Sequence, residues 1–176
     1  MRSASMGSVL SVPERPAVPE GKTRICVAGF GVSHNSGMAQ KLARKIYDLH
    51  SDQYEAFFYF ESMDFKNFLG KVKAEEGWVE SSFEKTAPEG VKTCTNFKDH
   101  GSSPLVWLEL PGGKKEYIGG RDFFCDWAGK KFKDEKEIVE LAGGDTPFAE
   151  PSFGDIWFDN KAQVLSGPAP ALAKPE

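Results

Sequence analysis

The chain has few of the residues that carry redox, metal or disulfide chemistry. Its 176 residues include only 3 cysteines and 3 histidines. Cys26, Cys94 and Cys125 are far apart and odd in number, which argues against a disulfide framework or a zinc site and is typical of a reducing compartment. We therefore expect a cytoplasmic protein without a bound metal.

Basic charge and long apolar runs are also scarce. The formal net charge is −4, with 22 Lys and Arg against 26 Asp and Glu, so we expect no basic surface for nucleic acid. No run approaches the roughly 18 apolar residues that a membrane span needs, so no span is expected. The chain is rich instead in aromatic residues, with 14 Phe and 4 Trp, which is enough to form the core of one domain.

The N-terminus begins with small and polar residues. It has no apolar stretch of the secretory type, so we expect no secretory signal; a short mitochondrial presequence is the alternative. Residues 6–11, MGSVLS, fit the N-myristoylation pattern, but they would carry a lipid anchor only if translation starts at Met6. Three prolines between residues 13 and 19 block a helix, so residues 1–22 are predicted to be a disordered or extended arm.

Apolar periodicity predicts strands that alternate with helices. Strands are predicted at residues 24–30, 54–60, 105–110 and 115–118. Helices are predicted at residues 38–49 with Ser36 as N-cap, at 65–77, and after Asp122 as N-cap. Residues 79–103 are predicted to be a long loop. This order implies a parallel strand pair to which a hairpin adds antiparallel strands, giving an α/β fold with a mixed four-stranded sheet flanked by helices.

The most specific pattern lies in residues 103–122. They read SPLVWLEL, then a Pro-Gly-Gly turn, then EYIGGRD. This segment resembles the C-terminal half of a glutaredoxin, where a cis-proline strand and a Gly-Gly-x-Asp turn together hold glutathione. The resemblance implies a thioredoxin-like fold of the glutaredoxin type over residues 23–133, with an arm on either side.

We expect no bound cofactor. The resemblance implies a vestigial ligand groove, for which glutathione is the one candidate ligand. The residues of this groove are His34, Ser103, Pro104, Gly119, Gly120, Arg121 and Asp122. In such a groove the backbone of Ser103 pairs with the ligand, and Gly119 and Gly120 permit close approach of the backbone. Asp122 matches the residue that meets the γ-glutamyl end. Arg121 stands where a small residue is common and would fill the site.

The catalytic half of that site is missing from the sequence. Aligning the first helix with that of the family places His34 at the nucleophilic cysteine and Gly37 at the resolving cysteine. Since the thiolate is the nucleophile, we expect no thiol–disulfide exchange by the family mechanism. Cys26 is predicted to lie in the core and Cys125 to be structural, which leaves Cys94 as the best candidate for a reactive thiol.

Residues 134–176 are predicted to be a C-terminal extension that packs on the domain or binds a partner. Large apolar side chains stand there among Gly, Asp and Pro. The candidate partner-binding residues are Phe148, Phe153, Ile156, Trp157 and Phe158. The last dozen residues are predicted to be disordered.

A second resemblance suggests a role. The pattern Ser-Pro-x-Val-Trp-x-Glu-Leu, a glycine turn and x-Gly-Gly before an aromatic helix is similar to the thioredoxin-like N-terminal extension of malate-dehydrogenase-like proteins of motile cilia, over roughly residues 24–132. It implies a redox-inactive structural or interaction subunit with protein partners in a larger assembly, such as the axoneme of a cilium. The missing dithiol favours a protein that is not an enzyme.

Other interpretations stay open at this point. One is a glutathione-dependent oxidoreductase or transferase that uses an atypical residue such as His34 or Cys94. Another is a module that binds glutathione or a peptide. A dinucleotide site at Gly29-Phe-Gly31, with Glu61 after the next strand, is disfavoured because its third glycine position holds His34.

Overall fold

The computed structural model describes residues 12–31, 33–61, 65–81, 96–143 and 162–169. Over these residues the protein is a mixed α/β structure with a six-stranded mixed sheet and four α-helices. In chain order the elements are β1 (Thr23–Phe30), α1 (His34–Leu49), β2 (Tyr54–Glu61), α2 (Phe65–Ala74), β3 (Trp78–Val79), β4 (Leu105–Glu109), η1 (Pro111–Gly113), β5 (Lys115–Gly119), α3 (Arg121–Lys131), α4 (Lys136–Ala142) and β6 (Gln163–Leu165). None of these helices is long and apolar enough to cross a membrane.

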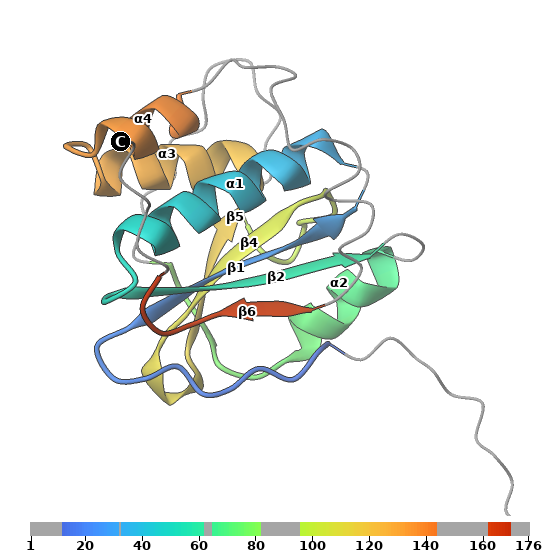
Figure 1. The fold of residues 1–176 in the computed structure, drawn as a ribbon. Coiled ribbons are helices and arrows are strands. Elements are labelled where there is room, and N and C mark those ends of the chain that lie inside the picture. Colours follow the sequence, from blue (N-terminus) through green and yellow to red (C-terminus); the bar gives the residue numbers. More distant parts are fainter. Residues whose placement is uncertain (1–11, 32, 62–64, 82–95, 144–161, 170–176) are drawn as a thin grey trace, which may run out of the picture.

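The centre of the sheet is formed by the four strands that periodicity predicts. The strand order is β3-β5-β4-β1-β2-β6. Strand β1 runs parallel to β2 and antiparallel to β4, and β4 runs antiparallel to β5 across the Pro-Gly-Gly turn. The predicted parallel pair and the predicted hairpin are therefore confirmed, and α1 makes the crossover between β1 and β2 (Figure 1).

The prediction of four strands is wrong, because two short strands extend the sheet at its edges. Strand β3 pairs parallel with β5, so the predicted loop 79–103 begins inside a strand. Strand β6 pairs antiparallel with β2 and comes from the C-terminal extension. Strands of two and three residues show no alternation of their own, since what defines them is their hydrogen-bonded neighbour.

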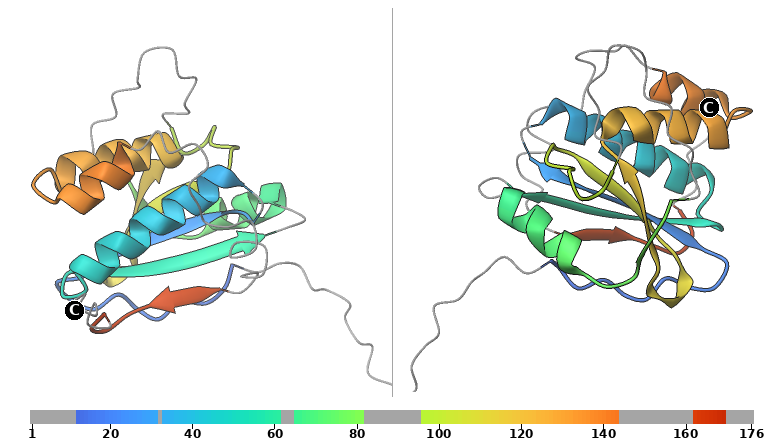
Figure 2. Two further views of the ribbon diagram at one scale, coloured as in Figure 1. Left: turned by 45° about the horizontal axis from the view of Figure 1, so that its top comes forward. Right: turned by 180° about the vertical axis from the view of Figure 1, so that it is seen from behind.

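Helices cover both faces of the sheet (Figures 1 and 2). On one face lie α1, α3 and α4, whose apolar side chains share a core with inward residues of β1, β2, β4 and β5. Its largest members are aromatic: Tyr47, Tyr54, Phe58, Phe60, Phe123, Phe124, Trp127 and Phe132. On the other face α2 packs on a second core, to which the strands contribute Cys26, Phe57, Tyr59, Trp107 and Tyr117. Alternate residues of β1 thus enter opposite cores, as the two-residue period of a strand requires.

Two helices begin at residues other than those predicted. Helix α1 begins at His34 with Ser33 as N-cap, so Ser36 is not the cap but a buried residue of the first turn. Helix α3 begins at Arg121 with Gly120 as N-cap, so Asp122 lies inside the first turn. An acidic side chain there still faces the positive end of the helix dipole, which explains why Asp122 looks like a cap in sequence.

The described parts of both arms lie against the domain. Residues 12–19 form neither helix nor strand, residues 20–21 form a turn, and Val12 packs on the core beneath α2. At the other end, Leu165 and Ala169 pack on the core beneath α1, and the Tyr47 hydroxyl donates to the carbonyl oxygens of Ser166 and Gly167. The prediction of disorder from residue 165 is therefore wrong for residues 165–169.

Candidate functional site

Four elements meet where the sequence predicts a ligand groove. They are the end of β1, the first turn of α1, the start of β4 and the first turn of α3. The Ser103–Pro104 peptide bond is cis. A Cβ on Gly29 would lie 3.3 Å from Pro104 Cα, and one on Gly120 would lie 3.7 Å from the Pro104 carbonyl oxygen. The structure thus brings Pro104 and Gly120 together at the end of β1.

A pair of serine hydroxyls occupies the centre of this junction. The Oγ atoms of Ser36 and Ser103 are 2.8 Å apart, and the backbone N–H of Phe30 donates to Ser103 Oγ at 2.8 Å. Gly29 makes room for the pair, because a Cβ there would overlap both hydroxyls. Ser103 therefore uses its side chain to tie β1, α1 and β4 together, and Gly29 has a packing reason that is independent of any dinucleotide.

His34 occupies the first position of α1 and is exposed. A residue in this position lies beside the unpaired N–H groups and the positive end of the helix dipole. His34 is thus placed at the open end of the helix. Met38 follows one turn later in α1, and its Sδ lies 3.5 Å from Nη1 of Arg121 in α3.

The Gly-Gly-Arg-Asp turn forms the start of α3. Gly119 has a φ of +135°, and a Cβ there would lie 2.8 Å from Phe123 Cδ2, so the turn requires glycine. The guanidinium of Arg121 donates to Asp122 Oδ1 from Nη2 at 2.6 Å and from Nε at 3.0 Å. Arg121 therefore pairs with one oxygen of Asp122, the residue that the resemblance predicts to meet the γ-glutamyl end, and both side chains are about one third exposed.

Both described cysteines sit in surroundings that suppress the thiolate. Cys26 is fully buried in the core beneath α2, and burial together with the charge of Glu109 raises the pKa of its thiol well above the ordinary value. Burial raises the pKa of the Cys125 thiol to about 11, although Arg121 opposes the shift. Cys94 lies outside the described residues, as do the predicted partner-binding residues Phe148, Phe153, Ile156, Trp157 and Phe158.

The loop that carries Ser103 is supported by a buried histidine that sequence reasoning left unassigned. His100 is 2% exposed. Its Nε2 donates to the carbonyl oxygen of Ser102 at 2.8 Å, so its Nδ1 accepts from the Tyr117 hydroxyl at 2.7 Å. His100 therefore holds the approach to Pro104 against β5.

A second polar cluster, which the sequence did not predict, lies beneath the N-terminal arm on the face that carries α2. Its residues are Arg15, Arg24, Glu55, Glu75, Glu109 and Lys115. Arg24 is 1% exposed and donates to Glu55 Oε2 from Nη2 at 2.7 Å and to Glu109 Oε2 from Nη1 at 3.1 Å. Buried charges of this kind persist only when they are paired.

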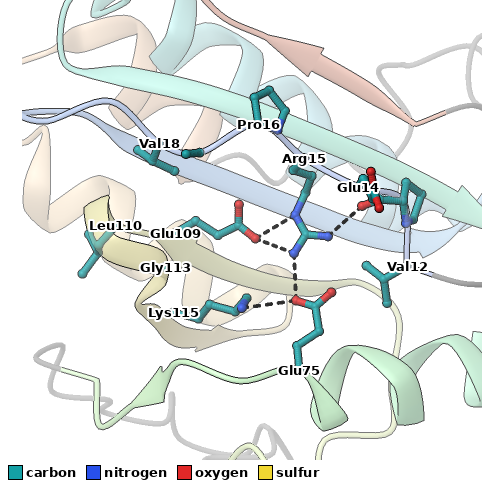
Figure 3. A pocket seen from close by; sticks show the side chains of 12 residues that line it. Val12, Glu14, Arg15, Pro16, Val18, Glu75, Glu109, Leu110, Gly113 and Lys115 are labelled. Carbon is teal, nitrogen blue, oxygen red and sulfur yellow. Dashed lines mark hydrogen bonds and ion pairs between the residues drawn. The ribbon is translucent and has the colours of Figure 1, made fainter.

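Arg15 joins this cluster from the arm (Figure 3). Its Nε donates to Glu109 Oε1 at 2.8 Å, and its Nη2 donates to Glu75 Oε2 at 2.8 Å. Burial opposes the charge on Arg15, but hydrogen bonds and charge from Glu109 and Glu75 outweigh it and raise the pKa of Arg15. A pocket of about 370 Å³ lies here, between the arm, Glu75 and the β4–β5 hairpin. No sequence motif marks this pocket, because the residues that line it come from three separate segments.

Among the described residues, no group of three or more His, Cys, Asp or Glu side chains is arranged to hold a metal ion. Comparison with protein-family models, with curated proteins and with solved structures gives no match for this chain. Inference about function therefore rests on this chain's own residues and on the two resemblances, over residues 103–122 and over roughly residues 24–132.

Proposed function

We propose that this chain contains a thioredoxin-like domain of the glutaredoxin type that does not catalyse thiol–disulfide exchange and serves as a structural or interaction subunit. Two features favour such a fold. The central strands follow the order β5-β4-β1-β2, with β1 parallel to β2 and the hairpin antiparallel. The cis Ser103–Pro104 bond at the start of β4 lies beside the first turn of α1, where a glutaredoxin has its dithiol.

The observation that carries the proposal is the chemistry at the start of α1. A catalytic thiol in this position relies on the helix end to stabilise its thiolate. Here His34 opens the helix, and the space beside Pro104 holds the hydrogen-bonded hydroxyls of Ser36 and Ser103. A hydroxyl pair that is engaged in this way fixes the backbone but offers no group for disulfide exchange.

The interaction role is supported by the arrangement of the C-terminal extension. Helix α4 and strand β6 pack on the domain on either side of residues 144–161. The five large apolar residues that the sequence predicts to bind a partner, Phe148, Phe153, Ile156, Trp157 and Phe158, stand between these two elements in the sequence. Four of them are aromatic, and aromatic residues are enriched at the centres of protein interfaces.

We propose that the partners are proteins of a larger cytoplasmic assembly, and that the assembly is axonemal. This part rests on the second resemblance alone. The test compares the wild-type chain with a variant in which the five residues are serine, each carrying the same affinity tag, in extracts of ciliated cells. The account expects a defined set of proteins with the wild-type chain and its loss with the variant.

The matched control replaces Val79 and Val139, which are 42% and 38% exposed, by serine. This variant should recover the same proteins as the wild-type chain. Equal recovery by the five-residue variant and the wild-type chain would refute the assignment of the interface.

A second candidate function is a module that binds glutathione or a peptide. The approach of Pro104 to Gly120 and the position of Asp122 in the first turn of α3 favour it. Titration calorimetry with reduced glutathione tests it on the full chain. Heat of binding that disappears in Asp122→Asn would support this module, and no heat would remove it.

A further inference from the structure

The N-terminal arm is anchored to the sheet chiefly through one side chain. Arg15 Nη2 lies 2.6 Å from Glu109 Oε1 and 2.8 Å from Glu75 Oε2. Its guanidinium carbon lies over the rings of Phe57 and Trp107, 5.1 and 5.8 Å from their centroids. We call the four residues that contact this guanidinium, Phe57, Glu75, Trp107 and Glu109, the arginine groove. A planar guanidinium suits such a site, because it can stack on aromatic rings while its fork donates to carboxylates.

The residues on either side of Arg15 contribute less. Glu14, Pro16 and Ala17 are exposed, and residues 12–19 form no strand with the sheet. The Pro16 carbonyl oxygen accepts a hydrogen bond from Arg24 Nη1 at 2.8 Å. The pocket of about 370 Å³ between the arm and the hairpin shows that the arm is not closely packed along its length. Detaching the arm therefore breaks few backbone contacts.

Both carboxylates of the arginine groove have a second cation. Glu109 also accepts from Arg24 and from Trp107 Nε1, at 3.1 and 3.2 Å. Glu75 also pairs with Lys115 Nζ, at 3.4 Å. Removing one partner of a buried pair is costly mainly because it strands the other charge. Here neither carboxylate is stranded when Arg15 leaves, so the arm can detach while the fold persists.

Release of Arg15 changes the charge of the groove. With Arg15 docked, the cluster holds three cations and three carboxylates. Without it, Arg24 and Lys115 face Glu55, Glu75 and Glu109, which leaves one negative charge beside two aromatic rings. The vacated groove is therefore complementary to another arginine, and it can take an extended segment such as the arm itself.

We propose that the arginine groove is a binding site for an extended, arginine-bearing segment of a partner protein, and that the arm is its exchangeable internal occupant. The turn at residues 19–22 supplies the hinge, since the Lys22 N–H donates to the Pro19 carbonyl oxygen and Gly21 has a φ of +78°. The site lies on the α2 face of the sheet. Binding at this site is independent of whether the domain is redox-inactive, and its test needs neither a disulfide substrate nor the assembly.

Thiol labelling of Cys26 in the full chain measures release of the arm. Cys26 is fully buried in the core on which Val12 packs, so we expect its thiol to be labelled faster when the arm, and Val12 with it, leaves that core. With Cys94 and Cys125 replaced by serine, Arg15→Ala should label at least about tenfold faster than the parent, as expected for loss of hydrogen bonds between charged groups. Lys114→Ala, which removes an exposed cation from the adjacent hairpin turn, should label at the parent rate.

Fluorescence anisotropy with a labelled peptide of residues 12–20 then measures occupation of the groove. The peptide should bind the full-length Arg15→Ala chain at least about tenfold more tightly than the wild-type chain, whose tethered arm competes at high effective concentration. A peptide with alanine at the Arg15 position should bind neither chain. If Arg15→Ala does not fold by circular dichroism, Glu75→Gln replaces it in the labelling measurement, because it weakens the same ion pair from the bend that follows α2.

Equal labelling of Cys26 in the parent and the weakened variant would overturn the proposal. So would equal affinity of the peptide for the wild-type and Arg15→Ala chains, or equal affinity of the two peptides for the Arg15→Ala chain.

Discussion

The hydroxyl oxygens of Ser36 and Ser103 lie 2.8 Å apart although the two residues are 67 positions apart in the chain. One comes from the first turn of α1 and the other precedes Pro104 at the start of β4. Their contact closes the junction where the sequence resembles a glutaredoxin active site. The following predictions test this junction, the charged cluster under the arm and the packing of the extension.

Ser36→Ala and Ser103→Ala should destabilise the fold to different extents. Ser103→Ala removes the acceptor of the Phe30 N–H as well as the partner of Ser36, so a loss of about 1–3 kcal/mol is expected for the donor left unsatisfied. Ser36→Ala should lose about 1 kcal/mol. In a double-mutant cycle measured by urea unfolding, the two changes should couple; strict additivity would show that the hydroxyl contact does not contribute.

Gly29→Ala should lower the free energy of unfolding by about 1–3 kcal/mol, the usual effect of forcing extra atoms into a packed site. The added Cβ would overlap both serine hydroxyls and would lie 3.3 Å from Pro104 Cα, which belongs to the backbone. Gly70→Ala is the matched control. Gly70 lies in α2 with no atom within 4 Å of an added Cβ, so this change should stabilise the fold by about 0.5–1 kcal/mol. A neutral Gly29→Ala would contradict the described junction.

Acid should loosen the cluster beneath the arm through Glu109. Burial favours the neutral acid, but hydrogen bonds and charge from Arg15, with Trp107 and Arg24, outweigh it and hold the pKa of Glu109 below its ordinary value of 4.5. The stability that this carboxylate contributes is therefore present above pH 4.5 and is lost as the pH falls through its lowered pKa.

The pH dependence of unfolding checks this assignment. Between pH 5 and pH 3, Glu109→Gln should show a smaller decline in the free energy of unfolding than the wild-type chain. Glu20→Gln, at an exposed position, should retain the wild-type slope. The same slope in the Glu109→Gln chain would show that this carboxylate is not the titrating group.

His34→Cys should create a reactive thiol if α1 begins where the proposed fold requires. A cysteine at a helix N-terminus has its thiolate stabilised by the helix end, so its pKa should fall below about 8.5. The labelling rate with iodoacetamide as a function of pH measures it in a Cys94→Ser background. Lys41→Cys, exposed in the middle of α1, should titrate near the ordinary value; identical titration of the two cysteines would contradict the prediction.

Truncation after residue 161 should destabilise the domain. It removes β6, the core contact of Leu165 and both acceptors of the Tyr47 hydroxyl. The thermal midpoint should fall by several degrees, as expected for a loss of about 1–2 kcal/mol. Truncation after residue 169 keeps all of these contacts and should leave the midpoint unchanged. A midpoint that is equally high in both truncated chains would show that β6 does not contribute.

The sequence predicts those elements whose pattern is local. The apolar spacing of Met38, Leu42 and Ile46 indicates α1, and the alternation around the Pro-Gly-Gly turn indicates the hairpin, because periodicity and turn chemistry are properties of neighbouring residues. Strands β3 and β6 are too short to show such a period. Each exists because a longer strand offers a free edge.

The polar contacts were the least predictable part. Ser36 has the residue type and position of an N-cap, but its hydroxyl bonds that of Ser103, which is 67 positions away in the chain. Arg15 stands in a proline-rich arm that resembles a disordered segment. Its partners Glu75 and Glu109 are 60 and 94 residues away, and no local rule connects residues at such separations.

The most direct test of the central claim is a thiol–disulfide exchange assay on the wild-type chain with a glutathione mixed disulfide as substrate. The account predicts no turnover above the uncatalysed rate, and no change on replacing Cys94 by serine. Turnover by the wild-type chain that is lost in Cys94→Ser would contradict a redox-inactive domain and would establish an oxidoreductase with an atypical site.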